Sequence, residues 1–253
     1  MNMILLAGII WPFLSAVIGY LIGRKNKNAR DAFVLFGCAL EFILCLILLH
    51  STVVSGEVSL TFGGICGLGL SFVCDGFRAV YACIAAFMWL MSNGVMAKDY
   101  FAHHYRNRNR YYLFTLMTEG ATLGVFFGAS LYTSFVFFEI MSLTSYVWVA
   151  HEENSSAMRA AETYLAVAII CGMVTLMGLF RLYHQIGTMM IDEIYSGDPV
   201  PLQRFTARVY TAIFTLSLAV QLRLFKKLPL YGLVLAALIT GCVLLAKIGR
   251  AHV

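Results

Sequence analysis

Charged side chains are scarce in this sequence. Asp, Glu, Lys and Arg make up 12% of the 253 residues, whereas apolar residues make up 60%. Soluble domains average about 25% charged and about 45–50% apolar residues. Because a soluble chain of this length needs charge to cover its surface, the composition excludes a soluble domain. It predicts an integral membrane protein.

Motifs that carry chemistry are also missing. The sequence has no P-loop and no G-x-G-x-x-G fingerprint. Its seven cysteines form no C-x-x-C pair, and most lie within apolar runs, where a thiol behaves as a small hydrophobe. We therefore expect no disulfide framework, no metal site and no cofactor. No nucleophile–base pair is visible, so enzyme activity of the chain alone is the least favoured class.

Long apolar runs dominate what is present. A helix needs about 20 apolar residues to cross the hydrocarbon core of a bilayer. The runs predict an all-α, polytopic transmembrane bundle of about eight helices within a single transmembrane domain, residues 1–253. Glycine-rich Gly63–Gly69 predicts an external hairpin between the second and third helices. The expected helices are Ile4–Ile22, Phe33–Val54, Phe77–Met96, Tyr111–Ala129, Leu131–Ala150, Ala160–Phe180, the short run Val209–Leu222, and Leu228–Ala246.

The basic residues predict the orientation of the chain. If the helices alternate, twelve Lys and Arg residues fall on one side and six on the other, so the positive-inside rule makes the richer side cytoplasmic and places the N-terminus outside. The net charge of +5 thus indicates topology and not nucleic-acid binding. The richer side has Arg24, Lys25, Lys27, Arg30, Lys98, Arg106, Arg108, Arg110, Arg159, Arg223, Lys226 and Lys227; the other has Arg78, Arg181, Arg204, Arg208, Lys247 and Arg250.

Carboxylates inside the apolar runs are the most informative residues, because ionisable groups in a bilayer are costly and by default suggest function. Glu139 lies near the middle of its run, with Ser142 and Tyr146 on the same helical face. Lipid cannot satisfy this polar stripe, so we expect Glu139 to be enclosed between helices. Two interpretations stay open: a proton carrier, or a protonated glutamate that links neighbouring helices.

Other ionisable residues are weaker candidates. Glu119, next to Gly120, is placed to face Glu139 and is a candidate relay. Glu162 is expected at the membrane interface, and a packing role for Glu41 is as well supported as a functional one. His184 is a candidate relay, although a loop histidine is more often simply exposed.

Two segments carry a resemblance. Leu60–Cys83 and, more strongly, Tyr111–Ile169 resemble the antiporter-like subunits of respiratory complex I, energy-converting hydrogenases and Mrp-type sodium/proton antiporters. The specific block is Phe137–Ile169 (FFEIMSLTSYVWVAHEENSSAMRAAETYLAVAI), with Glu139 and the Ala160–Tyr164 continuation. The similarity covers roughly residues 60–190.

The resemblance implies the N-terminal half of a bundle of about fourteen helices. Such subunits move protons, or sodium against protons, driven by electron transfer in partner subunits. It further implies that Glu139 pairs with a lysine on a later helix. The KAG…PLH-x-WLP pattern that supplies this lysine is missing at Leu218–Tyr231, and Thr163 stands where some members have lysine. Lys227, or its neighbour Lys226, is the remaining candidate partner; both also fit as positive-inside anchors.

The C-terminal part departs from the family. Ile248–Val253 (IGRAHV) resembles a translated sequencing adapter, and residues 216–247 are of doubtful register. These departures favour a chain truncated from a longer reading frame over a complete but divergent one.

The leading functional hypothesis is a proton-translocating subunit of a complex I-like or NiFe-hydrogenase-type respiratory assembly. The alternatives are an Mrp-type Na⁺/H⁺ antiporter subunit and a non-transporting membrane scaffold. The expected partners are other membrane and peripheral subunits of a redox complex and the lipid bilayer, without nucleic acid. The expected location is the bacterial inner membrane.

Overall fold

The computed structural model describes residues 2–63, 69–96 and 107–196. The last two expected membrane helices, and with them Lys226 and Lys227, lie outside the described residues. Within the described ranges the elements are α1 (Asn2–Lys25), α2 (Lys27–Ser55), β1 (Val58–Phe62), β2 (Leu70–Cys74), α3 (Gly76–Trp89), the π-helix η1 (Leu90–Met96), α5 (Arg108–Phe127), α6 (Leu131–Val149), α7 (Ser155–Ile186) and α8 (Ile191–Ser196).

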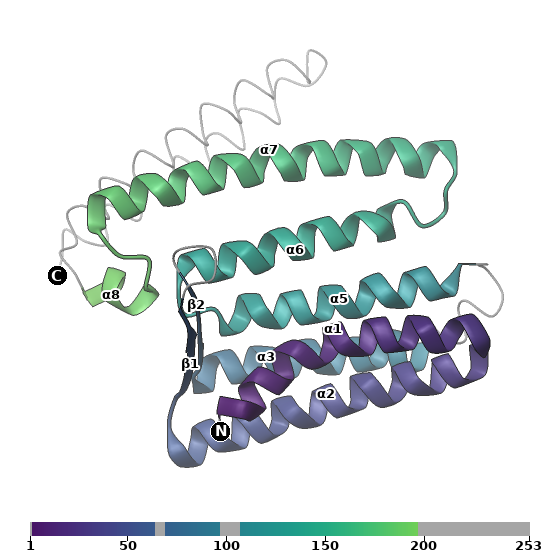
Figure 1. Ribbon diagram of the computed structural model, residues 1–253, viewed down its shortest axis with the longest axis horizontal. Coiled ribbons are helices and arrows are strands. Elements are labelled where there is room, and N and C mark those ends of the chain that lie inside the picture. Colours follow the sequence, from purple (N-terminus) through teal and green to yellow (C-terminus); the bar gives the residue numbers. More distant parts are fainter. Residues whose placement is uncertain (1, 64–68, 97–106, 197–253) are drawn as a thin grey trace, which may run out of the picture.

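The first six expected membrane helices are confirmed, and they run side by side in alternating directions (Figure 1). Three of them, α1, α2 and α7, are long and apolar enough to cross a membrane by length and composition alone. The third expected span is not one regular helix, because η1 continues α3 with wider π-type turns. The chain is thus a polytopic membrane helix bundle.

Polar caps fix where the helices begin. The side chains of Asn26, Asp75, Ser130 and Asn154 accept hydrogen bonds from backbone N–H groups in the first turns of α2, α3, α6 and α7. Such caps satisfy N–H groups that have no partner within the helix. At the other end of α7, Gly187 adopts a left-handed conformation (φ 84°) that ends the helix. These capping residues therefore mark the boundaries between apolar helices that follow one another closely in the sequence.

The expected hairpin between the second and third helices is present as an antiparallel pair, β1 and β2, with Val58 opposite Cys74 and Phe62 opposite Leu70. Its position outside the cell stays a prediction. It lies across one end of the bundle (Figure 1). The Thr133 hydroxyl of α6 accepts a hydrogen bond from the Ser71 N–H (3.0 Å). The hairpin is therefore tied to α6 and covers the helix ends at this side.

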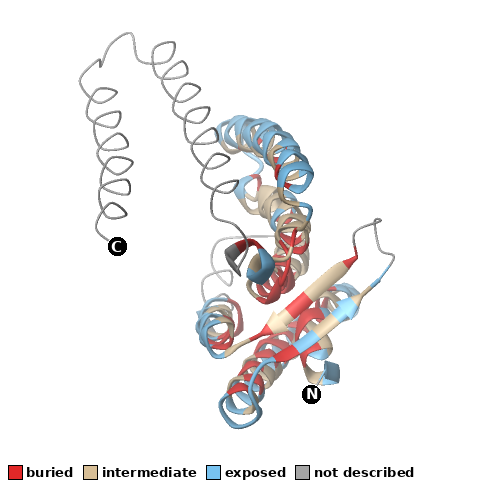
Figure 2. Cartoon of the chain, turned by 90° about the vertical axis from the view of Figure 1, so that its left-hand side faces the viewer, coloured by how far each residue is buried: buried red, intermediate tan, exposed pale blue. Residues whose placement is uncertain are grey.

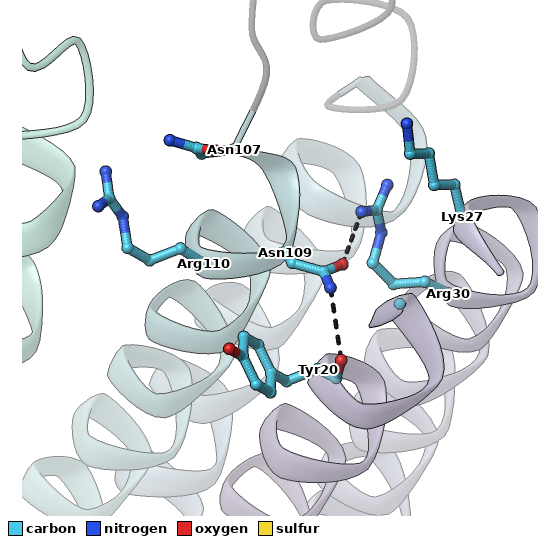
Figure 3. A pocket seen from close by; sticks show the side chains of 7 residues that line it. Tyr20, Lys27, Arg30, Asn107, Asn109 and Arg110 are labelled. Atoms are coloured by element: carbon cyan, nitrogen blue, oxygen red, sulfur yellow. Dashed lines mark hydrogen bonds between the residues drawn. The ribbon is translucent and has the colours of Figure 1, made fainter. Parts of the chain in front are cut away.

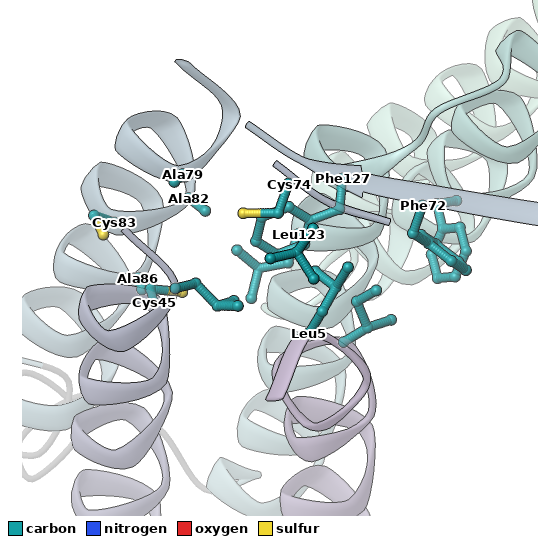
Figure 4. Packing of buried hydrophobic residues seen from close by; sticks show 14 residues of the cluster. Leu5, Cys45, Phe72, Cys74, Ala79, Ala82, Cys83, Ala86, Leu123 and Phe127 are labelled. Carbon is teal, nitrogen blue, oxygen red and sulfur yellow. The ribbon is translucent and has the colours of Figure 1, made fainter. Parts of the chain in front are cut away.

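The main core lies between α1, α2, α3, α5 and the hairpin (Figure 4). Cys45 and Cys83, from α2 and α3, pack there as buried, free thiols. Glycines let the helices approach: a Cβ on Gly124 of α5 would overlap the Phe137 ring of α6. Side chains farther from this core are less buried. Helix α7 packs mainly against α6 and is largely exposed (Figure 2).

Candidate functional site

Glu139 lies on α6 on the side turned away from α5. The α5-facing side of α6 is occupied by Phe137, against Gly124, and by Thr144, whose Oγ1 lies 2.8 Å from the Thr118 Oγ1 of α5. At about 100° per residue, Glu139 is about 140–160° around the helix from these two side chains. It points toward α7, where a Cβ on Gly172 would come within 2.5 Å of its Oε1. Because Gly172 has no side chain, the Glu139 carboxylate can occupy this space against α7.

The surroundings of Glu139 are only partly closed. Its side chain is half-buried, and within the described residues it forms no hydrogen bond or ion pair. Ser142 and Tyr146, which share its face, are half-buried as well. Nearby, the Tyr164 hydroxyl of α7 donates to the Ser142 carbonyl oxygen (3.2 Å). The polar stripe thus lies along the contact between α6 and α7, with Glu139 able to take a further partner.

The expectation that Glu119 faces Glu139 is wrong. Thr118 and Thr122 occupy the side of α5 turned to α6: Thr118 meets Thr144, and Thr122 donates to the Met141 sulfur. Glu119 follows Thr118 by one residue, about 100° around the helix. It is directed at α2, where its Oε2 lies 3.9 Å from the Cys38 Sγ.

Glu41 of α2 is the carboxylate that lies near Glu119. Cys38, which contacts Glu119, lies three residues before Glu41 on the same face of α2, and both glutamates are buried, with 1% and 2% of their surface exposed. We call them the acid pair. Sequence reasoning noted both residues but missed the pairing, because nothing in the order of residues reveals which faces of two distant helices meet. The apolar, cysteine-rich surroundings of Glu41 gave the one signal, namely that its carboxyl group would be desolvated.

The remaining candidates are at the ends of helices. Glu162 is exposed in the early part of α7, in keeping with an interfacial position. His184 is exposed in the last turn of α7 and does not follow the helix as expected. Lys227 lies outside the described residues. Across the described ranges, no three His, Cys, Asp or Glu side chains gather in a way that could hold a metal ion.

The helix ends opposite the hairpin (Figure 1) contain most of the described basic residues, and we call them the basic end. Its described basic residues are Arg24, Lys25, Lys27, Arg30, Arg108, Arg110 and Arg159. A cavity of about 350 Å³ opens there (Figure 3). The buried Arg30 donates to Asp31 (2.6 Å) and to the Asn109 Oδ1 (2.7 Å). The cavity is lined by Tyr20, Gly23, Lys27, Arg30, Asn107, Asn109 and Arg110.

The loop after α6 adds ionisable groups to the basic end. Arg110 of α5 forms an ion pair with Glu153 (2.5 Å). Burial, and next the Arg110 guanidinium, lower the pKa of His151 below its ordinary value, so this histidine is mostly uncharged at neutral pH. Among the described residues, the positive charge of the basic end therefore comes from lysines and arginines.

Comparison with known proteins agrees with this architecture. Residues 128–235 match the family model described as NADH:quinone oxidoreductase/Mrp antiporter, TM. The protein named as antiporter subunit mnhD2 of Staphylococcus haemolyticus is 29% identical over 197 residues, which are 76% of this chain and 38% of that protein. A Staphylococcus aureus counterpart is 29% identical over 195 residues, with the same coverage. The chain thus spans about two fifths of the length of these relatives.

Three solved structures share the fold. An archaeal membrane-bound sulfane sulfur reductase superposes with a TM-score of 0.70 at 17% identity, covering 81% of this chain and 43% of that one. The Mrp complex from Dietzia sp. gives 0.66 at 19% identity (87% and 42%). Respiratory complex I from Thermus thermophilus gives 0.63 at 18% identity (76% and 39%). At these identities the likeness concerns the fold alone.

Proposed function

We propose that this chain is an antiporter-like membrane subunit of the family described as NADH:quinone oxidoreductase/Mrp antiporter, and that it translocates protons within a multisubunit respiratory assembly. The observation that carries the proposal is the position of Glu139. A carboxylate on a membrane helix, half-buried between α6 and α7 and without a hydrogen-bond partner among the described residues, can bind and release a proton when a neighbouring charge moves. The proposed cationic partner is a lysine later in the chain, with Lys227 as the candidate.

A second candidate is an Mrp-type Na⁺/H⁺ antiporter subunit. The specific observation in its favour is that the sequence relatives named above are antiporter subunits. The two candidates use the same glutamate and differ in what drives it: electron transfer in a complex I-like or hydrogenase-type assembly, or a sodium gradient in an antiporter.

Inverted membrane vesicles that contain the assembled complex separate the two candidates. A pH-sensitive dye reports proton movement after addition either of an electron donor or of sodium. A response to the electron donor supports the respiratory assembly, and a response to sodium alone supports the antiporter. If vesicles with intact complex show neither response, the result contradicts ion translocation and favours the third hypothesis, a non-transporting membrane scaffold.

We also propose that the chain lies in the bacterial inner membrane with its N-terminus outside and the basic end in the cytoplasm. The described basic residues support this orientation: Arg24, Lys25, Lys27, Arg30, Arg108, Arg110 and Arg159 belong to the basic end, whereas Arg78 and Arg181 belong to the end with the hairpin. Positive residues are retained on the cytoplasmic side.

Reporter fusions test the orientation. Fusion after Lys25 is expected to give a fluorescent reporter that works only inside the cell, and fusion after Gly63, in the hairpin, an active phosphatase that works only outside. The reversed pattern at both positions would contradict the proposed topology. Paired fusions of both reporters at each position control for differences in expression.

A further inference from the structure

The acid pair, Glu41 and Glu119, is a feature of the bundle that the proposed role of Glu139 does not use. Glu41 is 1% and Glu119 2% exposed, so both carboxyl groups are inside the protein and removed from water and lipid. Their nearest polar contacts are thiols: the Cys45 Sγ lies 3.7 Å from the Glu41 Oε1, and the Cys38 Sγ lies 3.9 Å from the Glu119 Oε2. A thiol is a weak donor and does not replace a water molecule or a cation.

Each carboxyl group keeps one oxygen without a hydrogen-bond partner among the residues that the structure describes. The Glu41 Oε2 and the Glu119 Oε1 are buried and form no hydrogen bond within the described residues. One turn before Glu119, on the same face of α5, Thr115 is 2% exposed, and its hydroxyl likewise has no partner there. Among the described residues, these three buried polar groups of α2 and α5 thus lack a hydrogen-bond partner, whereas native interiors normally pair such groups.

The charges of the packed helices do not balance two carboxylates. The titratable groups that contact the pair are Cys38 and Cys45 of α2. Cys83 of α3 belongs to the same core cluster as Cys45. From α1 comes Gly8, where a Cβ would lie 3.5 Å from the Glu41 Oε1. No described Lys, Arg or His forms an ion pair with either glutamate. Burying an ionised carboxylate without a cation is strongly unfavourable, and a second ionised carboxylate nearby is more so.

A bound cation or a bound proton would neutralise the buried carboxylates, and the surrounding atoms indicate which of the two fits. Hard metal cations require several oxygen ligands, and the atoms that accompany the two carboxyl groups here are sulfur. A proton requires only one oxygen. We propose that Glu41 and Glu119 form a second protonation site of this membrane subunit, which holds protons between α2 and α5 and is separate from Glu139. Because this second site consists of other residues, the inference is independent of whether Glu139 carries protons.

Infrared spectroscopy of the full chain in lipid nanodiscs tests this site, since it detects the C=O stretch of protonated carboxyl groups. At pH 8, far above the ordinary carboxyl pKa values of about 4, exposed acids are ionised. Wild-type protein is expected to keep a protonated carboxyl band at pH 8, and Glu41→Gln/Glu119→Gln to lose it. Each single glutamine variant is expected to lose about half, and these variants serve if the double variant does not fold.

Two further variants identify the source of the band. Glu57→Gln, at an exposed position beyond α2, is expected to leave the band unchanged. Comparison of Glu139→Gln with the wild type measures how much of the band comes from the carboxyl group of Glu139 on α6. A wild-type protein without a protonated carboxyl band at pH 8, or a folded double variant that retains it in full, would overturn the proposal. Loss of the wild-type band when sodium replaces potassium would also overturn it, in favour of a cation site.

Discussion

Replacement of Glu139 by glutamine is expected to stop ion translocation by the assembled complex while the complex itself still forms. Glutamine keeps the size and polarity of the side chain but cannot release a proton. Because Glu139 is half-buried and has no hydrogen bond within the described residues, its replacement removes no such contact there. Loss of a proton-transferring group typically slows a reaction by about 10²-fold or more. The measurement is the initial rate of dye response in inverted vesicles, scaled to the amount of complex on native gels.

Glu162→Gln is the matched control, since Glu162 is exposed on α7 and its replacement is expected to keep the wild-type rate. A graded variant, Gly172→Ala, places a methyl group where the Glu139 carboxylate now lies and is expected to slow translocation without preventing assembly. Gly178→Ala, on the same helix, meets nothing within 4 Å and serves as its control. Full translocation by the Glu139→Gln complex would favour the scaffold interpretation.

The largest loss of stability is expected from Arg30→Ala. The Arg30 side chain is 3% exposed and forms an ion pair with Asp31, which is itself 8% exposed. It also donates to Asn109 of α5 and lies over the Tyr112 ring at 5.1 Å. Removing one partner of a buried ion pair typically costs about 3–5 kcal/mol, because the other charge stays buried. The more distant Arg108, 3.8 Å from Asp31, compensates only in part.

Thermal unfolding of the chain in lipid nanodiscs measures this effect as a lower midpoint for Arg30→Ala. Lys27→Ala, one helical turn earlier and exposed, is expected to change the free energy of unfolding by no more than about 0.5 kcal/mol. Adding Asp31→Asn to Arg30→Ala removes the stranded charge and is expected to recover part of the loss. Equal midpoints for Arg30→Ala and Lys27→Ala would show that neither the ion pair with Asp31 nor the contacts of Arg30 with α5 stabilise the bundle.

The elements of this fold were predictable to different degrees for physical reasons. The first six membrane helices follow from composition, because only a helix satisfies its own backbone in lipid. The hairpin follows from glycines that interrupt the apolar runs. The π-turns of η1 were not predictable, since Leu90–Met96 reads as a plain continuation of an apolar helix.

The sequence by itself determined that this chain is a membrane protein with alternating helices. It also determined that Glu139 is an isolated acid in an apolar helix. These follow from the cost of charge and unpaired backbone in lipid, which acts on each segment separately. Only the tertiary structure decided which acids meet. The direction of Glu119 and its pairing with Glu41 depend on how α2 and α5 are rotated against each other. That rotation is set by side-chain packing across the bundle, and no single helix contains it.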